Sequence, residues 1–474
     1  MAKRLTETDP QAAALEVIPL LDELSPTMCM AKWLWSSIHL TTGLTNSCFL
    51  PPLHKIDAEE VEQNFKALHN TKQKKKERAE MLSGGKPSGC STCWKVEAMQ
   101  GDHLSDRFYR SSEQWAQEGW NDVLAKGADG DIEPRYLEVN FNHACNLACS
   151  YCSPHLSSKW AEDIERNGPY PTKVPHNSIE YFKETGQYPI PVKEHNPYVE
   201  AFWKWWPKLY PDLHTFRITG GEPLMAKDTF KVLDYIIENP NPNLELNINS
   251  NLCVPDGLVD KMIEKAKRIQ GEGLIKDFKI YTSAEAHGKR AEYIRHGMDY
   301  NQWIDNCDKV LTEIPDCKIT NMATYNSLSL SSYQDLMKDL LDLRKKHHTD
   351  PAKSHAVSLD VSYLRWPPHQ SILIVQDDNY LKMLEDQVTW MFQNKEHSHW
   401  PPLCGIGMYD YEINRLQRIY WVMQQSPKHI KEKELIEGRK NFVAFFDEHD
   451  KRRGKNFLEV FPEMEDFYWE CKTL

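Results

Sequence analysis

The stretch Cys145-Asn-Leu-Ala-Cys149-Ser-Tyr-Cys152 carries three cysteines at C-x3-C-x2-C spacing. This spacing places three thiolates on one face of a short loop, where they can ligate a small iron–sulfur cluster. A [4Fe–4S] cluster usually takes four cysteine ligands, so three cysteines leave one iron open to another ligand. A zinc site completed by His143 is the alternative for this segment, although zinc cysteines commonly come in paired C-x2-C units.

Alternating strand and helix patterns follow this segment along the chain. Strand patterns rich in β-formers occupy residues 135–141, 214–218, 244–249, 278–283, 317–322 and 356–361. Helical patterns separate the last five of these strands, at residues 226–238, 256–269, 299–313 and 331–346. Alternation of this kind predicts βα units and an α/β fold with a parallel sheet. Ligands of such folds sit at the carboxyl ends of the strands.

Polar residues stand at several of these strand ends. The strand 214–218 runs into Thr219-Gly220-Gly221-Glu222-Pro223, where adjacent glycines permit a tight turn and a close approach to a ligand. The Glu222 carboxylate can accept hydrogen bonds from an ammonium group. Ser250 and Asn251 follow the next strand, and Ser283 ends the one after it. Taken singly, each residue is equally well explained as an ordinary turn or strand-end cap.

Taken together, these motifs resemble the radical S-adenosylmethionine (SAM) superfamily. The resemblance rests on the three cysteines, the aromatic residue before the third, and the Gly-Gly-Glu-Pro turn about 70 residues later. It implies a partial (β/α)6 TIM-like barrel and a [4Fe–4S] cluster on Cys145, Cys149 and Cys152. The open iron would bind the amino and carboxylate groups of SAM. Reductive cleavage of SAM would release a 5′-deoxyadenosyl radical that removes hydrogen from a substrate.

The same resemblance implies a set of cofactor-binding residues. The turn residues would bind the amino group of the methionine half, and the other strand-end residues its carboxylate and the ribose. These residues are Gly220, Gly221, Glu222, Ser250, Asn251, Ser283 and Arg295. Many relatives have Ser-x-Asp-Gly where this chain has Ser283-Ala-Glu285-Ala, so the role of Glu285 stays open. No side chain is assigned to the hydrogen transfer itself.

A second cysteine group precedes the barrel pattern. It consists of Cys29, Cys48, Cys90 and Cys93, with Gly43 between the first two. The spacing resembles the auxiliary-cluster motif of SPASM and twitch domains, which follows the barrel in relatives and here is permuted to the N-terminal side. We expect a hairpin that turns near Gly43 and a helix over 57–82 that returns the last two cysteines to the first two. Four thiolates would hold a second [4Fe–4S] cluster, with structural zinc as the alternative.

The chain has 474 residues, of which 40% are hydrophobic and 27% charged, and this composition predicts a globular protein of two or three domains. We divide it into a Cys-rich α+β domain (1–110), a linker (111–133), the barrel (134–370) and a helical C-terminal region (371–474). The net charge of −12 makes nucleic acid an unexpected partner. The absence of a long apolar run predicts no membrane span, and 12 cysteines without a secretory signal predict a cytoplasmic location.

Four further segments carry expectations of their own. The basic run 72–78 is interpreted as the solvated face of a helix rather than a nucleic-acid patch. The segment 154–196 is either a lid beside the site or surface decoration. The tryptophans in 203–206 are expected to pack in the core rather than to relay electrons. Cys404 is either a hydrogen-atom donor or a buried thiol, the latter being preferred.

The sequence thus predicts a radical SAM enzyme that acts on a peptide or protein. The same chemistry on a small molecule, such as a sugar or nucleotide, is the first alternative. A non-catalytic metal-binding protein on the same fold is the second. The expected partners are SAM, a peptide or protein substrate, and a low-potential electron donor such as flavodoxin or ferredoxin.

Overall fold

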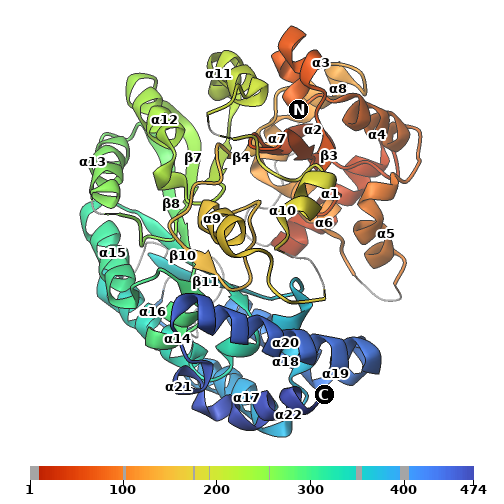
Figure 1. Ribbon diagram of the computed structural model, residues 1–474. Helices are drawn as coiled ribbons and strands as arrows, with labels where there is room; N and C mark the ends of the chain where they lie inside the picture. The colour runs from red at the N-terminus through yellow and green to blue at the C-terminus, as the bar shows by residue number, and fades with distance from the viewer. Residues whose placement is uncertain are drawn as a thin grey trace.

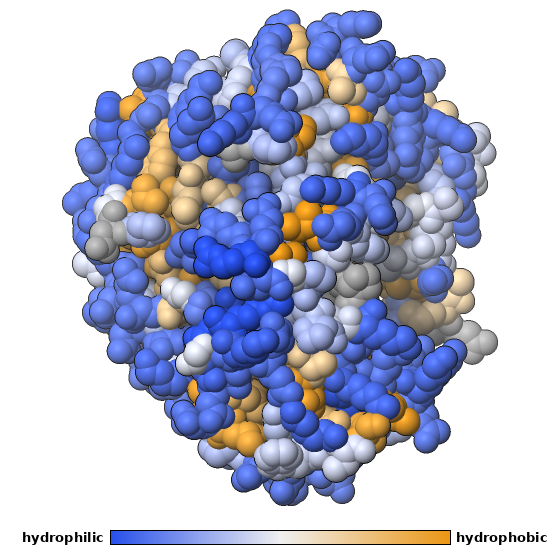
Figure 2. Space-filling model, in the orientation of Figure 1, coloured by the Kyte–Doolittle hydropathy of each residue, from blue (hydrophilic) through white to orange (hydrophobic). Residues whose placement is uncertain are grey.

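The computed structural model describes residues 10–99, 103–173, 177–191, 193–255, 257–348, 355–395 and 405–474. Within these ranges a nine-stranded sheet has the order β11-β10-β8-β7-β6-β4-β1-β2-β3 (Figure 1). Apolar side chains are gathered inside, and the face seen in Figure 2 is mostly hydrophilic with separate small hydrophobic patches. No helix in the described ranges is long and apolar enough to cross a membrane.

Six of the described strands form a parallel half of the sheet in chain order. They are β4 (Tyr136–Asn140), β6 (Thr215–Thr219), β7 (Asn241–Asn249), β8 (Ile275–Thr282), β10 (Lys318–Tyr325) and β11 (Val357–Tyr363). The helices between β6 and β11 are α12 (Lys227–Glu238), α13 (Leu258–Gly271), α14 (Gly288–Ile294), α15 (Tyr300–Glu313) and α16 (Tyr333–His347). The predicted α/β class and the six strand patterns of a partial TIM-like barrel are confirmed.

Each outer helix presents one apolar face to this sheet. In α12, for example, Phe230, Leu233 and Ile236 are buried while the intervening charged residues face outward. Spacing of three to four residues between apolar positions makes such a face. This pattern is why the helix boundaries could be read from the sequence to within a few residues.

The N-terminal region continues the barrel sheet instead of standing apart from it. Strand β1 (Trp35–His39) pairs parallel with β4, and β2 (Leu44–Asn46) and β3 (His54–Lys55) extend the edge in antiparallel fashion. The β1–β2 turn contains Gly43 at φ 65°, so the predicted hairpin is present. A Cβ at Gly43 would lie 2.1 Å from the ring of Tyr198, which only glycine avoids.

The prediction of a single helix over 57–82 is wrong. The segment forms α3 (Ala58–Gln63), η1 (Phe65–Leu68) and α4 (Lys72–Leu82). The side chains of Asn64 and Thr71 accept hydrogen bonds from the first turns of η1 and α4, so each acts as an N-cap that starts a new helix. The predicted return of Cys90 and Cys93 still occurs, on η2 (Ser88–Cys90) and α5 (Ser91–Glu97).

The interpretation of 72–78 as a solvated face is wrong for two of its residues. Lys74 and Arg78 are both 0% exposed. The Lys74 Nζ donates to the hydroxyls of Ser36 and Thr45, at 2.9 Å each, and Arg78 donates to the carbonyl of Lys32 at 3.2 Å. The reason is that α4 packs this face against the β1–β2 hairpin and α2, which places two cations in the interior.

A separate hydrophobic core belongs to the N-terminal region. It is formed with α1 (Pro10–Asp22), α2 (Ala31–Leu34), α6 (Asp106–Ser112), α7 (Gln114–Glu118) and α8 (Trp120–Lys126). Trp115 and Val123, which lie in the segment predicted as a linker, are buried in this core. The domain boundaries themselves stay a prediction.

The described part of the segment 154–196 contains helices α9 (Ser158–Asn167) and α10 (Ile179–Glu184) and leads into α11 (Pro197–Leu209). It is tied to the N-terminal region, because Ile190 N donates to Thr41 O at 2.8 Å. Trp205 and Trp206 on α11 are 0% and 1% exposed, as expected for packing residues.

The C-terminal region is helical, as predicted. Its helices are α17 (Asp378–Gln393), α18 (Asp410–Gln424), α19 (Ser426–His429), α20 (Glu432–Arg453), α21 (Phe457–Val460) and α22 (Glu465–Thr473). Phe445 on α20 stacks on Tyr170 at 4.7 Å between ring centroids, so this region also covers the segment that follows the cysteine loop. Cys404 lies outside the described residues.

Candidate active site

The three-cysteine loop follows β4 and is fixed from two sides. Its short strand β5 (Ala148–Cys149) pairs antiparallel with β9 (Arg295–His296). From helix α9, the Ser158 hydroxyl accepts a hydrogen bond from Cys145 N at 3.1 Å, and the Trp160 indole donates to Cys149 O at 2.8 Å. The loop backbone is therefore held by hydrogen bonds, and the cysteine side chains are left available.

The three thiols of this loop lie close enough to influence one another's ionisation. Burial raises the pKa of Cys145 to about 12, and the charge of Cys149 adds to the shift. Burial likewise raises the pKa of Cys152, with further contributions from Cys149 and Cys145. None of the three forms a disulfide. Because thiolates are the metal-binding form, a cationic group bound here would reverse these shifts. The donor set therefore fits a group that takes three thiolates.

The Gly-Gly-Glu-Pro turn packs directly against the cysteine loop. Glu222 N donates to Ala144 O at 2.7 Å. Gly220 has φ 132°, and a Cβ at Gly221 would lie 2.5 Å from Ala144 O and 2.6 Å from His143 O. The two glycines are thus required for the close contact between two backbones. The sequence predicted that the backbone of this turn approaches a ligand closely. In the structure it approaches the backbone of the cysteine loop.

Glu222 joins the ends of β6 and β7. Its carboxylate is 1% exposed and accepts hydrogen bonds from Leu224 N at 3.0 Å, Ser250 Oγ at 2.8 Å and Asn251 N at 2.7 Å. A carboxylate offers about four acceptor positions, so about one remains. Burial outweighs these donors and raises the pKa of Glu222 to about 7. The structure thus brings Glu222, Ser250 and Asn251 together at one edge of the sheet.

Arg295 is engaged by a carboxylate of the chain itself. Its guanidinium donates to Glu285 Oε2 at 2.8 Å and Oε1 at 2.5 Å, and to Tyr151 OH at 2.5 Å. The side chains of Arg295 and Glu285 are 9% and 0% exposed. A further contact joins Arg295 Nη1 to Cys149 Sγ at 3.6 Å. Sequence reasoning missed this pair, although the departure at Glu285 and the aromatic Tyr151 were both visible signals.

Ser283 stands apart from this group. It is half-buried just beyond β8 and forms no hydrogen bond with any residue in the described ranges. Its backbone neighbour Ala284 is instead fixed by Asn321, whose Oδ1 accepts from Ala284 N at 2.8 Å. The assignment of Ser283 to the cofactor site stays a prediction.

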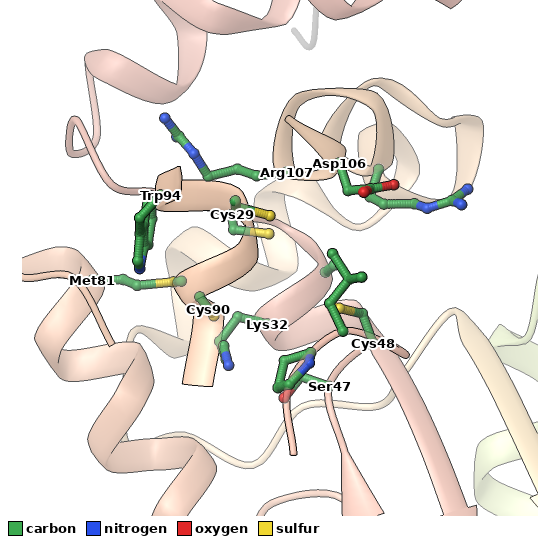
Figure 3. A pocket seen from close by; sticks show the side chains of 14 residues that line it. Cys29, Lys32, Ser47, Cys48, Met81, Cys90, Trp94, Asp106 and Arg107 are labelled. Carbon is green, nitrogen blue, oxygen red and sulfur yellow. The ribbon is translucent and has the colours of Figure 1, made fainter. Parts of the chain in front are cut away.

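The four N-terminal cysteines line one pocket. Figure 3 shows Cys29, Cys48 and Cys90 around it with Lys32 between them, and Cys93 also lines it. None of the four is in a disulfide. Burial raises the pKa of both Cys48 and Cys93 to about 12. Four free thiols around one pocket fit a group that takes four thiolates.

No three His, Cys, Asp or Glu side chains in the described ranges converge on a position for a single metal ion.

Several cations surround the N-terminal pocket. Lys32 is 2% exposed and pairs with Glu77 at 2.6 Å, and Arg107 pairs with Glu97 at 2.9 Å. Behind them lie Lys74 and Arg78, whose hydrogen bonds go to neutral groups. Burial lowers the pKa of Lys74, and the charge of an ionised Cys48 acts in the opposite direction, which places Lys74 within electrostatic reach of the thiols.

Comparison with known families identifies the class of protein. Residues 139–340 match the family model of the radical SAM superfamily, a range that runs from β4 to α16 and contains the three-cysteine loop, Glu222 and Arg295. The chain therefore carries a radical SAM domain and is an enzyme of the radical SAM class.

Individual proteins add little to this assignment. A search of curated proteins found no match. Among solved structures, Streptococcus suis SuiB has 12% identity and a TM-score of 0.34, with 76% of this chain and 68% of that chain covered. SuiB bound to S-adenosylmethionine has 14% identity and a TM-score of 0.29, with 76% and 68% covered. SuiB bound to precursor peptide SuiA has 13% identity and a TM-score of 0.33, with 80% and 71% covered.

Proposed function

We propose that this protein cleaves SAM reductively and uses the 5′-deoxyadenosyl radical to remove hydrogen from a peptide or protein. The observation that carries the proposal is the meeting of the three-cysteine loop with Glu222 and Arg295 at the carboxyl edge of a radical SAM domain. A [4Fe–4S] cluster on the loop supplies the electron for this cleavage when it is bound. Everything else in the reaction depends on how the chain binds and orients the two reactants.

The chain's own residues divide this work. The remaining acceptor position of Glu222 takes the ammonium group of SAM. The Gly220–Gly221 turn keeps that carboxylate against the cysteine loop, and Ser250 and Asn251 hold its other positions. The Arg295 guanidinium binds the cofactor carboxylate and gives up part of its hydrogen bonding with Glu285.

A cofactor cleavage assay tests the enzymatic proposal. Protein reconstituted with iron and sulfide and reduced with dithionite or flavodoxin should convert SAM to 5′-deoxyadenosine and methionine. The matched control is the variant with Cys145, Cys149 and Cys152 changed to Ala, which should yield none. If the wild-type protein with an intact cluster yields no 5′-deoxyadenosine with any reductant, it is the non-catalytic alternative that holds.

For the N-terminal pocket we propose a second [4Fe–4S] cluster, in a twitch-like domain permuted ahead of the barrel. The four free thiols and the surrounding cations support an anionic metal centre. Reconstitution should then give about eight iron and eight sulfide per chain, at ~4 of each per cluster. The triple Ala variant of the loop should retain about half. Zinc in the N-terminal set, with one cluster elsewhere, would overturn this assignment.

The second site also bears on the substrate. Enzymes with such auxiliary domains often modify peptides, which supports a peptide over a sugar or nucleotide. Changing Cys90 and Cys93 to Ala should preserve uncoupled 5′-deoxyadenosine formation and abolish turnover of the true substrate. Circular dichroism must first show a folded variant, since a metal site can contribute folding free energy. A folded variant with wild-type turnover would make the pocket merely structural. We place the reaction in the cytoplasm, with flavodoxin or ferredoxin as electron donor.

A further inference from the structure

A groove of about 750 Å³ runs beside the last strand of the sheet. Its strand side includes Val361, Tyr363 and Arg365, and its helix side, on α18, includes Arg415 and Arg418. The size lies within the roughly 300–1,000 Å³ of ordinary ligand sites. Neither cysteine group lines it, so it is separate from both candidate metal sites.

The strand side of the groove is an open sheet edge. Strand β11 ends the strand order, so it has a strand partner on one side only within the described ranges. Near its start the free edge is already closed by side chains: Arg344 Nε donates to Val357 O at 2.8 Å, and Leu359 N donates to Glu412 Oε1 at 2.9 Å. Backbone groups alternate between the two edges of a strand.

This alternation determines which backbone groups face the groove. Val361 and Tyr363 share an edge with Val357 and Leu359, and both line the groove. No side chain or strand in the described ranges hydrogen-bonds to the backbone of either residue on that edge. An extended peptide could therefore pair with them as an additional strand, a recurrent mode of peptide recognition.

The groove is also positively charged. Arg365 and Arg418 are exposed, and neither forms an ion pair with any residue in the described ranges. The Arg365 guanidinium lies 5.2 Å from the centre of the Tyr363 ring, which orients it along the strand. The third cation, Arg415, pairs with Asp360. Two unpaired arginines beside an open edge, in a chain of net charge −12, favour an acidic partner.

The groove leads to the candidate active site. Thr324 lines it, and Thr324 N donates to Glu285 Oε1 at 3.3 Å. Glu285 pairs with Arg295, which contacts Cys149 Sγ at 3.6 Å. A chain bound along β11 would therefore reach the carboxyl edge of the barrel at a point that these contacts link to the cysteine loop.

We propose that this groove binds an extended, acidic segment of the peptide substrate as a strand added to β11. Backbone hydrogen bonds to Val361 and Tyr363 set the register, and carboxylates of the segment pair with Arg365 and Arg418. The inference rests on the proposed peptide substrate and adds where that substrate is held and which charge it carries.

Fluorescence anisotropy with labelled model peptides tests the groove. The probe is an alternating Glu-Val peptide. Its comparison peptides are the Lys-Val counterpart and a Glu-Val peptide with alternate backbone amides N-methylated. The reconstituted wild-type protein should bind the first and neither of the others. The variant R365E/R418E should lose about tenfold in affinity, since exposed ion pairs contribute modestly. The control R166E/K267E makes the same change in net charge at exposed sites away from the groove and should bind like the wild type.

Three outcomes would overturn the proposal: no binding of the Glu-Val peptide, an equal loss in the control variant, or displacement of the peptide by an equimolar single-stranded oligonucleotide. Uncoupled cleavage of SAM, measured on the same samples, distinguishes a failure of the groove assignment from a failure of the proposed function. If 5′-deoxyadenosine forms while the peptide fails to bind, only the groove assignment fails. If no 5′-deoxyadenosine forms in any sample, the proposed function fails.

Discussion

The ionisation of Glu222 offers the sharpest test of the cofactor site. Burial raises the pKa of this carboxyl to about 7, even though three donors hold it. Only the ionised form attracts an ammonium group. Binding of SAM should therefore release a proton from Glu222 near neutral pH, and its affinity should rise as the pH is raised through 7.

The size of the effect follows from the pKa. At pH 6 about one-tenth of Glu222 is ionised, so the affinity should be about tenfold weaker than at pH 8, a difference of about 1.4 kcal/mol. Isothermal titration calorimetry of the reconstituted protein in two buffers of different ionisation enthalpy measures both affinity and proton release. Glu222→Gln removes the titrating group, so the pH dependence should vanish. The affinity at pH 8 should fall by about 1.5–3 kcal/mol, the contribution of a charge-assisted hydrogen bond.

Stability provides the control for this experiment. Because the folded-state pKa lies above the usual 4.5, protonated Glu222 stabilises the fold below pH 4.5 and this contribution is lost as the pH rises through 7. The loss should be about 3 kcal/mol in urea titrations of the wild-type protein and absent in the Gln variant. Equal affinity at pH 6 and pH 8, with no proton release, would refute the assignment of Glu222 to the ammonium group.

Three further predictions concern other parts of the molecule. Gly43→Ala should lower the thermal unfolding midpoint, because Gly43 has φ 65° and the added Cβ would collide with the Tyr198 ring. The expected loss of stability is about 1–3 kcal/mol. An unchanged midpoint would contradict the described geometry of the β1–β2 turn. Arg344→Met should cost about 3–5 kcal/mol in urea titrations, since Glu412 is 0% exposed and would lose its ion pair. Lys74→Met should lower the midpoint potential of the proposed N-terminal cluster in an EPR-monitored redox titration, and an unchanged potential would show that Lys74 does not act on the pocket.

The features that the sequence predicted depend on short stretches of chain. The strand patterns at 278–283 and 356–361 correspond to β8 and β11, where buried and partly exposed residues alternate, because such alternation is a local property of a strand. The meeting of Glu222 with Ser250 was also predictable, since carboxyl ends of neighbouring parallel strands share one edge. The cysteine spacing could be recognised for the same reason.

The features that were missed depend on partners distant in sequence. Lys74 looked solvated because lysine is almost never fully buried without a partner. Its interior position depends on hydroxyls of Ser36 and Thr45 on a hairpin about 30 residues or more away. The contact of Arg295 with Cys149 likewise needs β9 to pair with β5 of the cysteine loop, although the two residues are 146 positions apart in the sequence.

The two cysteine sites differ in the charge that surrounds them. Beside the three-cysteine loop, Arg295 is neutralised by Glu285 within a buried pair. Beside the N-terminal pocket, Lys32 and Arg107 also have carboxylate partners, but Lys74 and Arg78 behind them do not. The N-terminal pocket therefore has an excess of buried positive charge that the loop lacks.

That excess is costly unless the pocket holds an anion. Burial lowers the pKa of Lys74 well below its usual value and lowers the pKa of Arg78 to about 9, so the protein itself pushes these groups toward neutrality. The proposed cluster, with four thiolates around a doubly positive centre, would carry a net charge of −2 and relieve this cost. An additional electron on the proposed cluster would also be stabilised more in the N-terminal pocket than in the loop, where no net cation faces the thiols. If both proposed clusters are present, this charge distribution favours electron acceptance at the N-terminal site and strong reducing power at the three-cysteine loop, the direction that the proposed reaction requires.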